Sequence, residues 1–324
     1  MKAIQCQKHG PPSDLVFTEV SLDKPSEKEV LISIKACSLN FPDTLIIQGK
    51  YQFKPDLPFT PGSDIAGVVK AVGASVKHLK VGDEVFGFTM TGGFAQEAIV
   101  SAKNIFPKPP NMDFPIAASF LLAYGTSYHA LKDRARLKSG ETLVVLGASG
   151  GVGLAAIELG KVLGARVIAA ASTDEKLDVC KAHGADEVIN YSKEDLKNRI
   201  KELTDGKGAD VIYDPVGGNY SESALRAIGW EGRYLVVGFA AGDIPKIPLN
   251  LALLKGCQIV GVFWGVFATK DPKANMVNSM ELMQFFTEGK LNPRIHATYP
   301  LKDTPIALQE MMDRKVKGKS VIVM

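Results

Sequence analysis

Short apolar runs, separated by glycine, proline and polar residues, fill roughly the first third of the chain. Four of them lie at residues 29–34, 65–69, 83–87 and 94–100. Runs of this length, bounded by turn-forming residues, are typical of β-strands in a compact antiparallel domain. We therefore expect a barrel-like or sandwich β domain up to about residue 120.

From about residue 121 the pattern changes to an alternation of strands and helices. Two wholly apolar runs, 143–146 and 167–171, are each followed by a helical stretch that ends at a glycine, Gly164 or Gly184. Further strands are predicted at residues 187–190, 210–213, 233–237 and 259–263. Regular alternation of this kind predicts a doubly wound parallel sheet, with the last strand at its edge.

The pattern changes again in the last sixty or so residues. A helix is predicted at 275–288, with methionines at helical spacing that look like core filler, and a strand at 319–323. Because this tail is β-rich again, we expect it to fold back onto the first domain. The predicted organisation is a β-rich domain of residues 1–122 and 266–324, and a nucleotide-binding domain of residues 123–265.

The composition and charge of the chain argue against several classes of protein. The chain has 324 residues, 46% of them hydrophobic, and a formal net charge of +3. This is a globular composition, with no run of 18 apolar residues and scattered lysines, which argues against a membrane span or a nucleic-acid partner. No signal peptide is visible, and the four cysteines (Cys6, Cys37, Cys180 and Cys257) show no paired spacing. We expect a cytoplasmic protein with reduced thiols.

A glycine-rich loop follows the first predicted strand of the alternating region. It reads Gly-Ala-Ser-Gly-Gly-Val-Gly over residues 147–153 and opens a helix. In a Rossmann unit such glycines allow a tight turn and close approach of the backbone to a pyrophosphate, which the helix N-terminus binds. Ala148 departs from the G-x-G-x-x-G pattern. The loop predicts dinucleotide binding, with Ser149, Gly150, Gly151 and Val152 at the phosphates.

The end of the second strand indicates which dinucleotide binds. An NAD site usually has an acidic residue there to hold the ribose hydroxyls. Here the position holds Ser172, with Lys176 one helical turn onward, and this pair suits a 2′-phosphate. Asp174 is interpreted as the cap of the following helix, and Tyr191 can flank the adenine or bind the same phosphate. The prediction is NADPH.

The chain resembles the medium-chain dehydrogenase/reductase superfamily, and within it the zinc-independent quinone oxidoreductase (zeta-crystallin-like) branch. The resemblance covers essentially the whole length. Besides the glycine-rich loop it rests on segments at residues 39–44, 48–51, 61–67, 81–85 and 123–126. It implies a GroES-like β-rich catalytic domain beside a Rossmann domain, and NADPH-dependent reduction of quinones or α,β-unsaturated carbonyls.

Zinc-dependent relatives carry Cys, His and Cys or Glu ligands, plus a lobe of four closely spaced cysteines. In this chain Asn40 and Ser63 stand where, by the resemblance, the first two zinc ligands would be, and the sequence has no lobe of four closely spaced cysteines. These residues do not make a tetrahedral zinc site, so we predict no metal. Without a Lewis acid, reduction of an already electrophilic quinone or enone is favoured over interconversion of alcohols and aldehydes.

The resemblance also implies roles for individual residues. Asn40 and Tyr51 border nicotinamide and substrate, and Tyr51 is the candidate proton donor or oxyanion partner; alternatively it only lines the pocket and water supplies the proton. The other implied cofactor contacts are Thr126, Phe239, Ala240, Phe263, Arg314 and Lys319. Leu45 stands where relatives often have tyrosine, so substrate choice stays open.

Three further alternatives also remain. The first alternative is an enoyl-thioester reductase with the same cofactor residues. The second is a zinc alcohol dehydrogenase, and the third is a non-catalytic NADPH-binding protein of the crystallin type. The predicted edge strand at residues 259–263 would be exposed in a monomer, and the family commonly pairs such edges across a two-fold axis. We therefore expect a homodimer.

Overall fold

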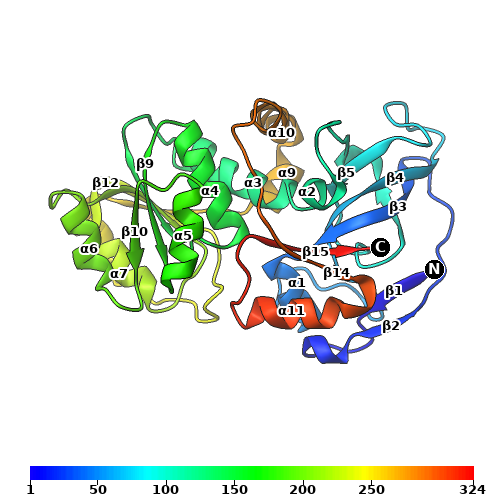
Figure 1. Cartoon of the computed structure of the whole chain (residues 1–324), viewed down its shortest axis with the longest axis horizontal. Coiled ribbons are helices and arrows are strands. Elements are labelled where there is room, and N and C mark those ends of the chain that lie inside the picture. Colours follow the sequence, from blue (N-terminus) through cyan, green and yellow to red (C-terminus); the bar gives the residue numbers. More distant parts are fainter. The chain divides into compact units, whose positions relative to one another are not determined.

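The computed structural model describes all 324 residues and divides the chain into two compact units (Figure 1). One unit comprises residues 1–122 and 294–324, and the other residues 123–293. The chain returns to the first unit at Arg294 rather than at residue 266. The segment 266–293, which we expected in the β-rich domain, therefore belongs to the second unit. No helix is at once long and apolar enough to cross a membrane.

The first unit is built on a seven-stranded sheet in the order β14-β15-β3-β4-β5-β7, with β6 paired to β3. Most pairs are antiparallel, and Ile32, Ile34 and Ile65 on the central strands are fully buried in its core. The C-terminal strand β15 pairs with β3, so the tail folds back as predicted. The elements are β1 (Lys2–Gln5), β2 (Val16–Glu19), β3 (Glu29–Ser38), α1 (Phe41–Ile47), β4 (Asp64–Val72), β5 (Glu84–Phe88), β6 (Glu97–Ser101), β7 (Ile105–Pro107), α2 (Phe114–Ala118), β14 (Ile295–Pro300), α11 (Thr304–Met312) and β15 (Lys319–Val323).

The second unit is a six-stranded parallel sheet in the order β10-β9-β8-β11-β12-β13. The chain winds outward from β8 in both directions, which confirms the predicted doubly wound fold and the edge position of β13. Its central strands are apolar on both faces, as burial between two helical layers requires. The elements are α3 (Leu121–Tyr128), the π-helical turn η3 (His129–Arg134), β8 (Thr142–Leu146), α4 (Gly151–Val162), β9 (Arg166–Ala171), α5 (Asp174–Ala182), β10 (Glu187–Asn190), α6 (Leu196–Leu203), β11 (Ala209–Asp214), α7 (Tyr220–Arg226), β12 (Ile228–Val236), α8 (Asn250–Lys255), β13 (Gln258–Gly261), α9 (Trp264–Lys270) and α10 (Pro272–Thr287).

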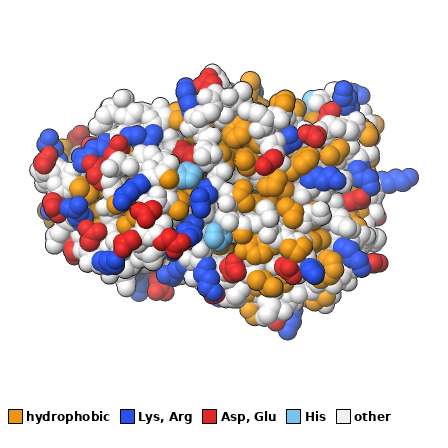
Figure 2. All heavy atoms as spheres, viewed as in Figure 1, with side chains coloured by type: hydrophobic (Ala, Val, Ile, Leu, Met, Phe, Trp, Pro, Cys, Tyr) orange, Lys and Arg blue, Asp and Glu red, His pale blue; other side chains and the backbone are white.

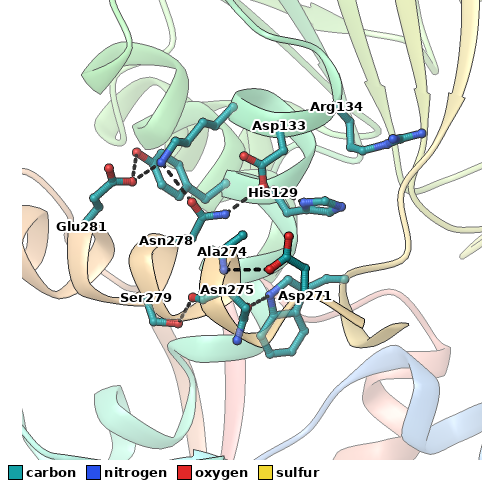
Figure 3. Close-up of polar contacts among 12 residues, drawn as sticks. His129, Asp133, Arg134, Asp271, Ala274, Asn275, Asn278, Ser279 and Glu281 are labelled. Atoms are coloured by element: carbon teal, nitrogen blue, oxygen red, sulfur yellow. Dashed lines mark hydrogen bonds and ion pairs between the residues drawn. The ribbon is translucent and has the colours of Figure 1, made fainter. Parts of the chain in front are cut away.

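Polar contacts between α10 and η3 explain why α10 belongs to the second unit (Figure 3). The Lys132 ammonium donates to the side-chain oxygen of Asn278 at 3.0 Å and forms an ion pair with Glu281. Asn278 in turn donates to the Asp133 carboxylate at 2.8 Å, and that carboxylate also lies 2.7 Å from the His129 ring nitrogen. The apolar periodicity that predicts α10 gives no information about these partners on its polar face.

Charged side chains of both signs are interspersed over the second unit on the face that Figure 2 shows. Ion pairs between neighbouring elements of this unit include Lys161 with Asp186 and Arg166 with Glu187, each at 2.7 Å. No field of a single sign marks this face.

Candidate functional site

The predicted cofactor residues of the second unit gather at one edge of the parallel sheet. The glycine-rich loop follows β8, Ser172 follows β9, and Tyr191 follows β10. Phe239 and Phe263 come after β12 and β13. Because the carboxyl ends of parallel strands meet at the same edge, and ligands of open α/β sheets bind there, the fold brings these residues to one side.

The glycine-rich loop leaves no room for larger side chains at two positions. Gly147 has a φ of +56°, and a Cβ there would lie 2.6 Å from the Val216 side chain. A Cβ on Gly153 would lie 2.6 Å from the Gly147 carbonyl oxygen. Gly150 caps α4 without any side-chain hydrogen bond, so the first N–H groups of this twelve-residue helix are left for an anion. The loop fits the pyrophosphate of a dinucleotide.

Ser172, Lys176 and Tyr191 come together beside this loop. The Lys176 ammonium donates to the Ser172 hydroxyl at 3.3 Å. Asn190 pairs with Ala171 in the sheet, and the Tyr191 N–H donates to the Ala171 carbonyl at 3.2 Å, so Tyr191 lies next to Ser172. The Ser172 hydroxyl and the Lys176 ammonium thus share one end of β9, a pair that suits a 2′-phosphate, while the Tyr191 ring lies 4.3 Å from that of Tyr220.

Asp174 does not cap α5 as predicted. The cap is Thr173, whose hydroxyl accepts from the Lys176 N–H at 3.3 Å. The Asp174 carboxylate instead accepts from the Asn190 side chain and from the Lys193 ammonium, each at 2.6 Å. The ion pair with Lys193 lowers the pKa of Asp174. The Asp174 carboxylate is therefore already paired with a cation.

Asp214, at the end of β11, has a positioning role that the sequence reasoning missed. One carboxylate oxygen accepts from the N–H groups of Val216 and Gly217 at 2.8 and 2.9 Å. The other accepts from the Ser221 hydroxyl at 2.7 Å and from the Tyr234 hydroxyl. This buried carboxylate fixes the loop at the topological switch point of the sheet. The sequence shows an aspartate at the end of an apolar strand, but it does not show that four groups donate hydrogen bonds to its carboxylate.

The remaining predicted cofactor residues of the second unit lie after β12, after β13 and on helix α3. The Ala240 N–H donates to the Pro215 carbonyl at 3.0 Å, and a Cβ on Gly217 would touch the Phe239 ring at 2.8 Å. Phe263 is the N-cap of α9 and is half-exposed. Thr126 lies on α3 next to Ser127, whose hydroxyl donates to the Val152 carbonyl in the first turn of α4 at 2.8 Å.

The first unit holds a separate buried polar cluster around Asn40. Asn40 is the N-cap of α1, and its backbone N–H donates to the Asp43 carboxylate at 2.7 Å. Its side-chain nitrogen donates to the Asp64 carboxylate at 3.4 Å, which also accepts from Ser38 at 3.5 Å. Burial raises the pKa of Asp43 to about 7 and that of Asp64 to about 6. Both carboxyl groups therefore hold a proton more readily than an exposed aspartate does.

Lys319 belongs to this cluster, which corrects the expectation that it reaches cofactor phosphates. Its ammonium donates to the Leu39 carbonyl at 2.7 Å and to the side-chain oxygen of Asn40. The side chain is buried, because β15 places it against the strand end at Ser38 and Leu39. Arg314, by contrast, is exposed in the turn after α11, and its predicted cofactor contact stays a prediction.

Tyr51 follows α1 and is partly buried against the core of the first unit. Burial, and then the negative charge of Asp43, raise the pKa of Tyr51 above its ordinary value. The hydroxyl therefore keeps its proton across the physiological range. It is suited to donating a hydrogen bond to an oxyanion rather than to ionising.

The two positions that resemble zinc-ligand positions hold Asn40 and Ser63. The Asn40 side-chain oxygen accepts from an ammonium, and burial raises the pKa of the neighbouring Cys37 well above its ordinary value, which disfavours the thiolate that a metal requires. No group of three or more His, Cys, Asp or Glu side chains is arranged to hold a metal ion.

Comparisons with known proteins agree with this architecture. The family model described as alcohol dehydrogenase GroES-like domain matches residues 26–110, and that described as zinc-binding dehydrogenase matches residues 151–281. "Quinone oxidoreductase-like protein 2 homolog" of Nematostella vectensis is 39% identical, over 99% of this chain and 88% of the relative. "Quinone oxidoreductase" of Rattus norvegicus is 33% identical, over 100% of this chain and 98% of the relative.

Solved structures give the same picture. Escherichia coli quinone oxidoreductase, solved in complex with NADPH, has a TM-score of 0.95 and 31% identity over 100% of both chains. The CurK enoyl reductase has a TM-score of 0.91 and 26% identity over 100% of this chain and 99% of that chain.

Proposed function

The chain belongs to the zinc-independent quinone oxidoreductase branch of the medium-chain dehydrogenase/reductase superfamily, and we propose that it reduces quinones or α,β-unsaturated carbonyls with NADPH. The observation that carries the choice of cofactor is the contact between Ser172 and Lys176 beside the glycine-rich loop, where an NAD site usually has an acidic residue. A similar protein of Escherichia coli binds NADPH, which supports the same choice.

The residues of the second unit fit this cofactor. The loop at residues 147–153 would hold the pyrophosphate, and Ser172 and Lys176 the 2′-phosphate. When bound, NADPH supplies a hydride, which together with one proton converts a quinone to a hydroquinone or an enone to a saturated ketone. The protein has to orient the acceptor and stabilise the oxygen on which negative charge develops.

Asn40 and Tyr51 are the two side chains of the first unit that we propose orient the acceptor and stabilise the negative charge on its oxygen. The Asn40 side-chain nitrogen has two N–H groups and donates one of them to Asp64. Tyr51 keeps its hydroxyl proton because burial and Asp43 raise its pKa. Both are neutral donors, which suits an acceptor electrophilic enough to take a hydride without a Lewis acid.

Replacing Tyr51 with phenylalanine is expected to lower kcat/KM with a quinone or enone about 10-fold, the value of one net hydrogen bond of ~1.4 kcal/mol. The NADPH dissociation constant should not change. The matched control is Tyr299→Phe, because Tyr299 is also partly buried in the first unit but bonds Glu310 at 2.5 Å. Unchanged kcat/KM in Tyr51→Phe would show that water supplies the proton and that Tyr51 only lines the pocket.

An enoyl-thioester reductase is the second candidate, and the similarity to the CurK enoyl reductase favours it. It uses the same cofactor residues and differs only in the acceptor. Leu45, on α1, makes the region around Asn40 more apolar than a tyrosine there would. Turnover of an enoyl thioester faster than of any quinone would select this candidate.

We further propose a homodimer formed through β13. This strand pairs only with β12, lies last in the sheet, and leaves Ile259 exposed. Unpaired strand edges with apolar side chains favour pairing with a second copy. Light scattering at micromolar concentration should give the mass of two chains, and Ile259→Lys should weaken the dimer at least about 10-fold through one buried charge.

The control for the dimer is Ile306→Lys, which changes an apolar side chain on α11 that is 56% exposed. It should leave the mass unchanged. A monomeric mass for the unmodified protein would contradict the proposed dimer.

A further inference from the structure

Lys319 is a buried cation without a direct carboxylate partner. Lysines are rarely buried, and taking an ammonium out of water costs several kcal/mol unless it is well partnered. Its side chain is only 7% exposed, and its direct contacts are two carbonyl oxygens, those of Leu39 and of the Asn40 side chain. Burial lowers the pKa of Lys319, while the nearby charges of Asp64 and Asp43 act in the opposite direction. A charge kept at this cost calls for a reason beyond packing.

The contacts of Lys319 determine how the Asn40 amide is oriented. The amide oxygen faces the ammonium, so the amide nitrogen must lie on the other side, where it donates to Asp64 at 3.4 Å. The backbone of Asn40 is fixed as well, through its N–H bond to Asp43. An amide flip would place the NH₂ group against the ammonium and its oxygen against a carboxylate. Both contacts would be repulsive, so the cluster permits one orientation.

The same contacts change how strongly Asn40 donates. A cation on the oxygen of an amide draws electron density from its nitrogen, and chained hydrogen bonds polarise one another in a low-dielectric interior. The nitrogen carries two hydrogens, of which Asp64 accepts one. The second N–H is therefore both fixed in direction and strengthened as a donor.

We propose that Lys319 is a positioning residue, whose ammonium orients and polarises the Asn40 amide so that the remaining N–H stabilises the oxyanion formed on the reduced acceptor. This rests on the proposed function, in which Asn40 borders the substrate. Lys319 itself touches neither cofactor nor substrate. Its effect should therefore appear in the rate of reduction and not in the binding of NADPH.

The test compares Lys319→Met, Lys319→Arg, Asn40→Ala and the double variant Lys319→Met/Asn40→Ala in the full-length protein. Methionine keeps an apolar stem but removes the charge, and kcat with a quinone or enone should fall at least about 10-fold, because one oxyanion donor is typically worth 10²–10³. The dissociation constant of NADPH should stay within about twofold. Arginine, which keeps the cation, should restore part of kcat.

The double variant separates positioning from a structural role. If Lys319 acts through Asn40, adding Lys319→Met to Asn40→Ala should lower kcat hardly any further. If the two residues act independently, the two decreases in kcat should multiply. Lys315→Met is the matched control, because Lys315 is exposed and pairs with Asp313 at 3.1 Å. It should leave kcat unchanged. If Lys319→Met does not fold, Lys319→Met/Asp64→Asn removes an opposite charge at the same time, and its kcat should be low as well.

The possible results distinguish this proposal from the proposed function. If the unmodified protein does not oxidise NADPH when a quinone, an enone or an enoyl thioester is supplied as the acceptor, both the proposed function and this proposal are wrong. If the unmodified protein is active and Lys319→Met keeps its kcat, only the positioning role is overturned. A variant that loses NADPH affinity instead would show that Lys319 contacts the cofactor, and a multiplicative double variant would show that it does not act through Asn40.

Discussion

Lys176→Ala is expected to weaken NADPH binding about 10- to 150-fold, and to leave NADH binding nearly unchanged. The reason is that a charge-assisted hydrogen bond to a phosphate is typically worth about 1.5–3 kcal/mol, and the ammonium has no such partner on NADH. Lys176 already contacts Ser172 at the end of β9, so its loss removes the cation of the proposed 2′-phosphate site. Fluorescence titration of both cofactors against both proteins measures the change.

Ser172→Asp should go further, because a carboxylate repels the 2′-phosphate of NADPH and accepts hydrogen bonds from the ribose hydroxyls of NADH. The matched control is Lys181→Ala on the same helix, where the lysine is exposed and lies 3.6 Å from Asp178. It should leave both affinities unchanged. Equal affinities of the unmodified protein for NADPH and NADH, or equal losses of both in Lys176→Ala, would contradict the assigned phosphate site.

Asp214→Ala is expected to lower the free energy of unfolding by about 3–5 kcal/mol, the usual cost of breaking a buried charged network. The substitution leaves the N–H groups of Val216 and Gly217 without their acceptor, together with the hydroxyls of Ser221 and Tyr234. Chemical denaturation followed by circular dichroism measures the loss. Asp214→Asn, which keeps one acceptor oxygen, should lose less.

Asp178→Ala is the control for this experiment, since Asp178 is exposed and its ion pair with Lys181 is long. Its effect should stay within about 0.5 kcal/mol. A loss below about 1 kcal/mol in Asp214→Ala would show that the loop after β11 does not depend on this carboxylate.

The parallel sheet could be predicted from the sequence because its central strands are apolar on both faces and its first two helices are followed by Gly164 and Gly184. The same reasoning places the glycine-rich loop, Ser172 and Tyr191, since strand ends are fixed by the alternation itself. Their grouping follows from the sheet order, and the pairing of β10 with β9 confirms that Tyr191 lies next to Ser172.

Partners of polar side chains could not be predicted in this way. Thr173 and Asp174 are both good helix caps, and the Asn190 and Lys193 contacts that occupy Asp174 depend on how the next strand, β10, pairs with β9. The place of α10 depends on bonds to Lys132 and Asp133, which periodicity does not encode.

Lys319 shows the same limit most clearly. The resemblance to the family implies that Lys319 reaches a cofactor phosphate. The structure turns it inward because β15 pairs with β3, whose end carries the Leu39 carbonyl and Asn40. Burial of a charge follows from the three-dimensional pairing of strands, and no local pattern reveals it.

The most direct test of the proposed function is a comparison of kcat/KM for NADPH oxidation across acceptors, made with chelator-treated protein. The panel contains an ortho-quinone, a para-quinone, a short enone, an enoyl thioester and a saturated aldehyde of similar size. We expect turnover of at least one quinone or enone, none of the aldehyde, and no loss of rate on removal of metal ions. Reduction of the saturated aldehyde that depends on zinc, or no turnover of any conjugated acceptor, would contradict the proposed function.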